Sequence, residues 1–148
     1  MQIAEILKPE RIAVSNGITS KKGVLEELAR LIALDTPDLT QTEVFDSLCA
    51  RERLGSTGLG HGVAIPHGRL KAGKHTLGAF IQLSSGVDYD AVDQQPVDLL
   101  FALLVPEEST DQHLQILARL AEMFSDTDFI RKLRYANSSE RLYELLRQ

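Results

Sequence analysis

The run Val97-Asp-Leu-Leu-Phe-Ala-Leu-Leu-Val105 is apolar at eight of its nine positions. It is far shorter than the roughly 20 residues that a membrane-spanning helix needs, and its length suits a strand. A strand with one wet face alternates apolar and polar residues, whereas a continuous apolar run is typical of a strand covered on both faces. The run therefore predicts the central strand of a sheet with helices on both sides.

Three more strands and two helices are expected on the N-terminal side of this run. Residues 11–14, 63–65 and 77–83 are short and rich in β-branched or apolar residues, and each predicts a strand; Pro66 would end the second of these by removing a ladder donor. Ser20 can cap the first helix, whose apolar positions recur at helical spacing: Leu25, Leu28, Ala29, Ile32 and Ala33. The second helix begins at the capping box Thr40-Gln-Thr-Glu43, with Leu39 and Val44 placed for the hydrophobic staple, and should end near Leu54.

Three helices are expected on the C-terminal side. Ser109-Thr-Asp-Gln112 is a second capping box, and the helix behind it has one face formed by His113, Leu117, Leu120, Ala121 and Phe124. Asp126 or Thr127 would cap the next helix, which is expected to bury Phe129, Ile130 and Leu133. Ser138 or Ser139 would cap the last helix, which is expected to bury Leu142, Leu145 and Leu146. Strands and helices mix without strict alternation, and neither a repeat nor a low-complexity linker interrupts them. We therefore expect one compact α/β domain over residues 1–148, with a mixed sheet.

Composition excludes several classes of protein. The 148 residues are 43% hydrophobic and 25% charged, which is ordinary for one globular domain. The net charge of −5, from 21 acidic against 16 basic residues, argues against a nucleic-acid binder. One cysteine, Cys49, allows neither an intrachain disulfide nor an all-cysteine metal site. Without an export signal or an apolar run of about 18 residues, we expect no membrane span and a cytoplasmic location.

Glycines concentrate in residues 55–68, Gly-Ser-Thr-Gly-Leu-Gly-His-Gly-Val-Ala-Ile-Pro-His-Gly, which hold five of the chain's ten. One reading is a plain surface turn; the other is a loop whose backbone N–H groups converge on an anion. A Walker loop is disfavoured because no Gly-Lys-Ser/Thr ending is present, and a dinucleotide fingerprint because the loop follows a helix and leads into a strand. The candidate phosphate-loop residues are Gly55, Ser56, Thr57, Gly58, Gly60 and His61.

His67, between Pro66 and Gly68, is the candidate nucleophile, although a solvated histidine in a turn is the commoner case. A neutral imidazole, with an ordinary pKa near 6.5, is nucleophilic at cellular pH. Arg51, near the end of the preceding helix, offers a guanidinium fork that matches phosphate oxygens. Together with loop amides, these groups suit an in-line phosphoryl transfer.

His113 is a second candidate, either as a supporting imidazole or as a core histidine on the same face as Leu117 and Leu120. A zinc site made from His61, His67 and His113 is disfavoured because the chain has no HExxH or cysteine-rich pattern. We therefore expect no metal and no cofactor.

Residues 55–68 resemble the active-site signature of the fructose/mannitol type of IIA domain, from the phosphoenolpyruvate-dependent phosphotransferase system. Residues 90–106, followed by His113 and Leu114, are similar to the nitrogen regulatory subgroup of that family. The resemblance implies a three-layer α/β/α domain with a mixed sheet, the fold of the phosphotransferase/anion transport proteins. It also implies that His67 is phosphorylated on a ring nitrogen, that Arg51 steadies the phosphoryl group and that His113 supports the site.

The resemblance further implies a phosphorylated HPr-like carrier of the nitrogen branch as the donor, and regulation of nitrogen metabolism and potassium handling by phosphorylation state. His61 stands where the family has asparagine, so a second titratable ring is expected beside the loop. Three alternatives stay open: a IIA component serving fructose or mannitol uptake, an interaction module that is not phosphorylated, and a small hydrolase or nucleotide binder. We expect a monomer or a weak dimer.

Overall fold

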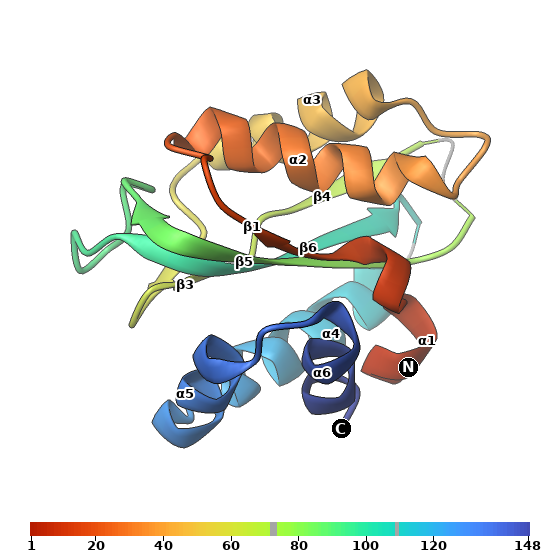
Figure 1. Cartoon of the computed structure of the whole chain (residues 1–148). Helices are drawn as coiled ribbons and strands as arrows, with labels where there is room; N and C mark the ends of the chain where they lie inside the picture. Colours follow the sequence, from red (N-terminus) through yellow and green to blue (C-terminus); the bar gives the residue numbers. More distant parts are fainter. Residues whose placement is uncertain (72–73, 109) are drawn as a thin grey trace.

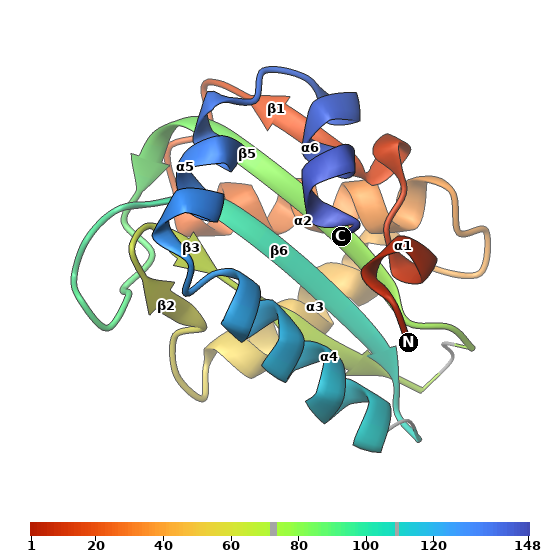
Figure 2. The ribbon, with the colours of Figure 1, turned by 90° about the horizontal axis from the view of Figure 1, so that it is seen from below.

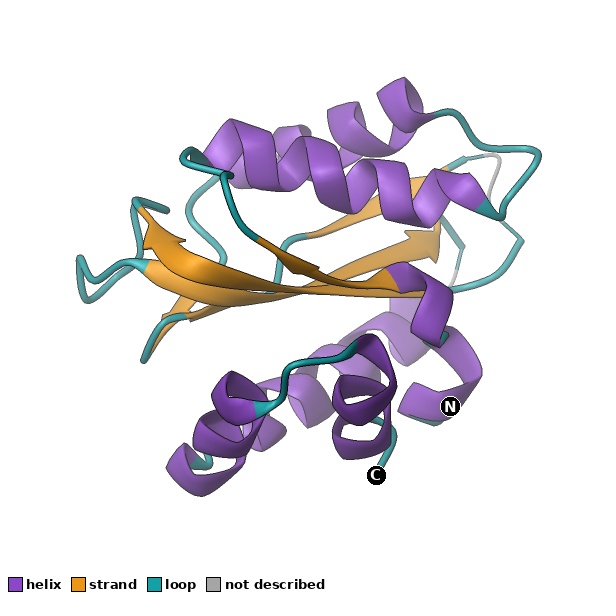
Figure 3. Cartoon of the chain, viewed as in Figure 1, coloured by secondary structure: helices purple, strands orange, loops and turns teal. Residues whose placement is uncertain are grey.

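A mixed sheet separates two layers of helices (Figures 1 and 3). The computed structural model of the chain describes residues 1–71, 74–108 and 110–148, apart from the side chains of Thr110 and Gln112. One face of the sheet carries α2 (Lys21–Leu34) and α3 (Gln41–Glu52). The other carries α1 (Ile3–Ile6), α4 (Thr110–Met123), α5 (Thr127–Tyr135) and α6 (Ser139–Leu146). The predicted three-layer α/β/α fold is confirmed.

The sheet has six strands in the described part of the chain, in the order β1-β5-β6-β3-β2, with β4 also paired to β6. Their bounds are β1 Ile12–Ser15, β2 Gly58–Gly60, β3 Val63–Ala64, β4 His67–Leu70, β5 Leu77–Val87 and β6 Val97–Pro106. β5 and β6 are antiparallel, as are β2 and β3, whereas β1 runs parallel to β5 and both β3 and β4 run parallel to β6. The sheet is therefore mixed, as predicted, and β6 lies in its middle (Figure 2).

Alternate residues of β6 enter the two helical layers. Leu99, Phe101, Leu103 and Val105 pack in the cluster that includes the buried side chains of α4, α5 and α6. Leu100, Ala102 and Leu104 pack in the cluster formed with α2 and α3. All seven are nearly or fully buried, so the apolar run is the doubly covered central strand that its sequence indicates.

The helix starts lie where the capping residues predict them. Ser20 Oγ accepts the Gly23 amide at the start of α2, and Thr40 and Glu43 form the predicted capping box of α3. Of the alternatives, Asp126 caps α5 and Ser138 caps α6. The predicted box at Ser109 and Gln112 lies outside the described residues. None of the helices in the described part is long and apolar enough to cross a bilayer.

Two details of the predicted helices are corrected. α3 ends at Glu52, two residues before the expected end. The buried positions of α4 include Ile116, whereas Ala121, which was expected on that face, is exposed. At 100° per residue Ala121 lies about 100° around the helix from Leu120, beyond the edge of the buried stripe.

Residues 55–70 contain more regular structure than the sequence indicates. β2 and β3 form a hairpin, and His67 begins β4, where a turn was expected after a strand. Pro66 separates β3 from β4, and its carbonyl accepts the Leu103 amide at 2.9 Å, so both short strands stay paired to β6. Strands of two to four residues have too few positions to establish a period of two. The helix α1, with four residues, is likewise too short to establish the helical period of 3.6, and the sequence does not predict it.

Gln82, a buried side chain of β5, ties the sheet to the end of α5. Its Nε2 donates to the carbonyls of Leu133 at 2.6 Å and Ala136 at 2.7 Å. Gln82→Leu leaves these buried carbonyls unpaired, and we expect the free energy of unfolding to fall by about 2 kcal/mol. Urea denaturation measures this, with Gln95→Leu at an exposed position as the matched control. Equal midpoints for Gln82→Leu and the unchanged chain would contradict the prediction.

Candidate active site

His67 lies at the N-terminal end of β4, opposite Leu103 of β6, and its ring is half-buried. Its Nδ1 is 2.8 Å from the carbonyl oxygen of Ile65. A carbonyl can only accept a hydrogen bond, so Nδ1 carries the proton and Nε2 keeps its lone pair. The backbone before Pro66 thus selects the tautomer in which Nε2 is the basic nitrogen.

His113, in the first turn of α4, brings a second imidazole beside the first. The two ring centroids are 5.3 Å apart and the rings are tilted by 49°. The side chain is 6% exposed, and its buried Nδ1 has no hydrogen-bond partner among the described residues. Buried N–H groups without an acceptor are rarer than acceptors without a donor, so we assign the proton of His113 to Nε2.

Arg51 completes the group from the last turn of α3. An open depression of about 460 Å³ is lined by Ser47, Ala50, Arg51, Leu54, His67, Gly68, Arg69 and His113. α3 can lie this close to β4 because a Cβ on Gly68 would be only 2.3 Å from Ser47 Oγ and 2.9 Å from Ser47 O. The structure therefore brings the predicted His67, Arg51 and His113 into one depression.

Arg69 is a lining residue that the sequence reasoning missed. It lies two residues after His67 on β4, and side chains two apart on a strand point to the same face. Had β4 been recognised as a strand, this period would have placed Arg69 beside His67. Among the described residues, no carboxylate lies within ion-pair distance of its guanidinium.

Both imidazoles are held neutral at pH 7. Burial lowers the pKa of His67, and the positive charges of Arg51 and Arg69 add to this, while the Ile65 carbonyl and the Glu52 carboxylate act in the opposite direction. Burial, then the charges of His67 and Arg69, lower the pKa of His113 to about 4. A neutral His67 has a lone pair at Nε2, and a neutral His113 still has an N–H to donate.

The glycine-rich segment is used differently from what the sequence suggests. Ser56, Thr57 and Gly58 line a smaller depression of about 260 Å³ that also reaches Arg51 and His67. However, the Thr57 amide donates to Glu52 Oε1 at 3.2 Å, the Gly58 amide to Ser56 Oγ at 3.1 Å, and the Gly55 amide to Glu52 O at 3.1 Å. These three N–H groups bind acceptors of the chain itself, which differs from the expected cradle of amides around an anion.

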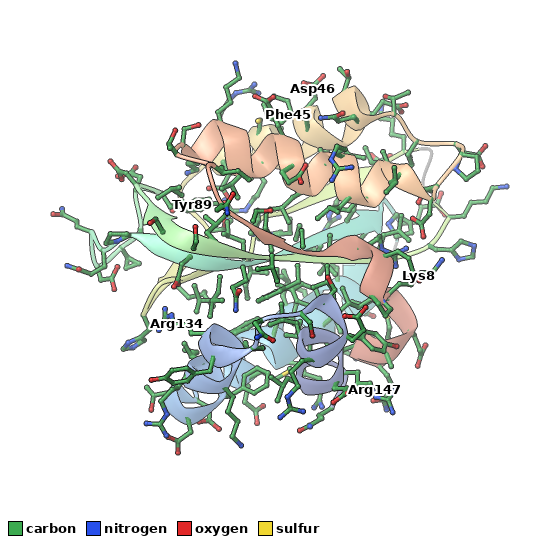
Figure 4. All side chains as sticks on the ribbon, viewed as in Figure 1. Lys8, Phe45, Asp46, Tyr89, Arg134 and Arg147 are labelled. Atoms are coloured by element: carbon green, nitrogen blue, oxygen red, sulfur yellow. The ribbon has the colours of Figure 1, made fainter. Side chains whose placement is uncertain are left out.

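Gly60 and His61 lie at the turn of the β2–β3 hairpin and line neither depression. The His61 amide donates to Asp93 at 3.1 Å, and the His61 carbonyl accepts from Arg134 of α5 at 2.6 Å. Arg134 is labelled in Figure 4. His61 therefore lines a different cavity, between α5 and the β5–β6 loop, and does not line the depressions at His67. Within the described ranges no three His, Cys, Asp or Glu side chains are grouped so that they could hold a metal ion.

Comparison with known proteins is consistent along the whole chain. The family model described as "Phosphoenolpyruvate-dependent sugar phosphotransferase system, EIIA 2" matches residues 5–148. A nitrogen regulatory protein of Pseudomonas aeruginosa is 44% identical over 146 residues, which are 99% of this chain and 95% of that protein.

Two solved structures share the fold. The crystal structure of the nitrogen regulatory protein IIA-Ntr from Neisseria meningitidis superposes with a TM-score of 0.90 at 43% identity, over 97% of this chain and 98% of that one. IIA mannitol from Escherichia coli superposes with a TM-score of 0.77 at 22% identity, over 95% of this chain and 98% of that one. The chain therefore belongs to the EIIA type 2 family of the phosphotransferase system, the phosphoryl-transfer components that include its nitrogen regulatory homologues.

Proposed function

We propose that this protein is a phosphoryl carrier that accepts phosphate on Nε2 of His67 from a phosphorylated HPr-like protein. The observation that carries the proposal is the contact of His67 Nδ1 with the Ile65 carbonyl at 2.8 Å. It leaves Nε2 as an unprotonated nitrogen in an open depression that also holds Arg51 and His113. A pre-oriented neutral imidazole beside a guanidinium and an N–H donor is suited to receiving a phosphoryl group.

In the proposed reaction, the Nε2 lone pair of His67 attacks the phosphorus of the donor's phosphohistidine. The new N–P bond forms as the donor's N–P bond breaks, and the electron pair of the broken bond stays on the donor's imidazole. Positive charge then develops on the His67 ring, and the Ile65 carbonyl stabilises its Nδ1–H. Arg51 and the Nε2–H of His113 bind the phosphoryl oxygens and oppose their negative charge.

Exposed leucines surround the proposed reaction site. Leu54 is 83% exposed, Leu59 is 42% exposed and Leu114, next to His113, is 60% exposed. No carboxylate is among the residues that line the two depressions at His67. An apolar surface with Arg51 and Arg69 at its centre lets an anionic phosphocarrier approach although the whole chain has a net charge of −5.

The test is phosphoryl transfer in vitro. The purified chain is incubated with phosphoenolpyruvate, the first phosphotransferase enzyme and an HPr-like carrier. We expect stoichiometric phosphate on the protein that is lost in acid and kept in alkali, as a phosphohistidine requires, and a phosphoramidate signal by ³¹P NMR. An unlabelled protein beside a fully phosphorylated carrier would contradict the proposal and favour a pure interaction module.

We also propose a regulatory role that depends on the phosphorylation state, in nitrogen metabolism and potassium handling, rather than service to a sugar permease. Support comes from the nitrogen regulatory relatives that match the chain at 40% to 44% identity over nearly its whole length. A cytoplasmic location belongs to the same proposal, because the phosphoryl donor has to reach His67.

The pH dependence of transfer follows from the lowered pKa of His67. A protonated Nε2 cannot attack phosphorus, so the rate falls only as pH drops through the pKa of His67 in the folded protein. Because burial lowers that pKa below its ordinary value near 6.5, we expect the inflection of the acid limb to lie below pH 6.5. Rapid-quench single turnovers at each pH, started from pre-phosphorylated carrier, measure this.

A charge variant serves as the internal control for this profile. Arg69→Gln removes a positive charge that lowers the pKa of His67, so its acid limb should move to higher pH. An inflection at or above pH 6.5 in the unchanged protein would contradict the assignment.

A further inference from the structure

We propose that Glu52 is a positioning residue for phosphoryl transfer: its buried carboxylate holds the Gly55–Thr57 segment and, through it, the guanidinium of Arg51. This inference rests on the proposed function of His67. The Glu52 side chain is only 5% exposed although it directly follows Arg51 at the end of α3. Burying a carboxylate is costly unless partners compensate it, so its set of partners shows what it holds.

Three donors meet this carboxylate. Lys21 Nζ, from the first turn of α2, lies 2.8 Å from Oε1. The backbone amide of Thr57 donates to Oε1 at 3.2 Å, and the Thr57 hydroxyl donates to Oε2. Glu52 thereby joins the start of α2 and the end of α3 to the segment that follows α3.

Tyr89, on the β5–β6 connection, completes the network; its side chain is labelled in Figure 4. It is fully buried, and its hydroxyl lies 3.2 Å from Thr57 Oγ1. The Thr57 proton is already donated to Glu52, so the Tyr89 hydroxyl is the donor in this contact. Its carbonyl accepts from Ser56 Oγ at 3.1 Å and from Lys21 Nζ at 3.2 Å. Burial and the Glu52 charge raise the pKa of Tyr89, so it stays protonated and keeps donating.

The network reaches the reaction site through Arg51. Arg51 Nη1 donates to the Gly55 carbonyl at 2.9 Å, and the Gly55 amide donates to the Glu52 carbonyl at 3.1 Å. The segment from Gly55 to Thr57 is therefore held at both ends, by Arg51 and by the Glu52 carboxylate. If the carboxylate is replaced by an amide, an NH2 donor takes the place of one oxygen, so the Thr57 amide or the Thr57 hydroxyl loses its acceptor. The Gly55 carbonyl that orients the guanidinium is then free to move. Misplacement of a transition-state contact by about 1 Å can slow a reaction by about 10²-fold.

Glu52→Gln tests this, with Glu43→Gln as the matched control. Glu43 lies in the first turn of the same helix, and its substitution removes one carboxylate charge at the opposite end of α3, where glutamine can still complete the capping box. We expect Glu52→Gln to lower kcat for phosphoryl acceptance by about tenfold or more, with KM for the phosphorylated carrier unchanged, because the exposed leucines are untouched. Glu43→Gln should keep kcat within about twofold of the unchanged chain.

Two NMR readouts separate positioning from loss of stability. The Glu52 charge raises the pKa of His67, so the imidazole titration of His67 should move to lower pH in Glu52→Gln and stay in place in Glu43→Gln. The Thr57 amide proton should shift upfield in Glu52→Gln, because its carboxylate acceptor is replaced by a neutral side-chain amide, a weaker acceptor. Thr57→Val, which removes only the hydroxyl, should lower kcat in the same direction and carries the test if Glu52→Gln does not fold.

The outcomes are distinguishable. If the unchanged chain is phosphorylated and Glu52→Gln accepts phosphate at the same rate, the role of Glu52 is overturned and the proposed function stands. The role of Glu52 is also overturned if Glu43→Gln, at equal loss of thermal stability, slows transfer as much as Glu52→Gln. If the unchanged chain takes up no phosphate, the proposed function fails and this inference fails with it.

Discussion

His67→Ala is expected to take up no phosphate from a phosphorylated carrier under conditions in which the unchanged chain is labelled to completion. The substitution removes the nitrogen that, in the proposed reaction, forms the N–P bond, and the neighbouring imidazole cannot replace it. His113 is 6% exposed, its Nδ1 is buried, and its Nε2 is the protonated nitrogen in our assignment. Removal of a covalent nucleophile that has no substitute leaves no route to the intermediate.

The measurement is phosphate incorporation followed by gel shift or mass spectrometry of the intact protein. His75→Ala is the matched control, because His75 is an exposed histidine of the β4–β5 connection and should leave labelling unchanged. Labelling of His67→Ala at more than a trace would place the phosphoryl group on another residue. Peptide mapping under alkaline conditions would then identify that residue.

Arg51→Ala is expected to slow phosphoryl acceptance by about 10²- to 10³-fold, the usual effect of losing one preorganised transition-state donor. The guanidinium lines the depression with His67, and its Nη1 bond to the Gly55 carbonyl limits its movement before the donor arrives. Lysine at this position keeps the charge but not the planar fork, so Arg51→Lys should recover only part of the rate. Single-turnover transfer from pre-phosphorylated carrier gives the rates directly.

Arg53→Ala is the control for this series, since Arg53 is an exposed arginine two residues away that does not line the depression. It should change the rate by less than about threefold at moderate salt, because exposed charges are screened. If Arg51→Ala and Arg53→Ala slowed transfer equally, Arg51 would act through long-range attraction of the carrier and not through contact with the phosphoryl group.

Much of the fold could be predicted because its signals are local. A capping box needs two residues three apart, so Thr40 and Glu43 predict the start of α3 whatever surrounds them. The end of α3 was less well predicted. The helix ends at Glu52, whose carboxylate binds Lys21 of another helix and the Thr57 amide, and the helix sequence itself carries no sign of these partners. Of the three short strands in residues 58–70, β3 was predicted, as residues 63–65, whereas β2 and β4 were missed. These two are stable only through pairing that reaches β6, directly or through β3, more than thirty residues away along the chain.

The candidate site divides in the same way. The sequence indicated His67 and Arg51 through residue types close together in one motif. It indicated His113 through its position on the helix after the central strand, with a core histidine as the alternative, and the supporting role of His113 came from the resemblance. It misjudged His61, because a hairpin turns this residue toward Asp93 and Arg134. The sequence did not indicate Arg69, because β4 has only four residues, too few to show the alternation that would place Arg69 on the same face as His67.

By itself, then, the sequence determined the layer architecture and the helix starts, which depend on short-range spacing and on one nearly continuous apolar run, and it supplied His67 as the candidate nucleophile through its motif. Only the tertiary structure decided which nitrogen of His67 is basic and how close His113 comes to it. It also decided that the amides of Gly55, Thr57 and Gly58 donate to Glu52 and Ser56 rather than to an anion. The physical reason is that a hydrogen bond is made by atoms at about 3 Å, and only the completed fold brings together the atoms of residues as distant as Lys21, Glu52 and Tyr89.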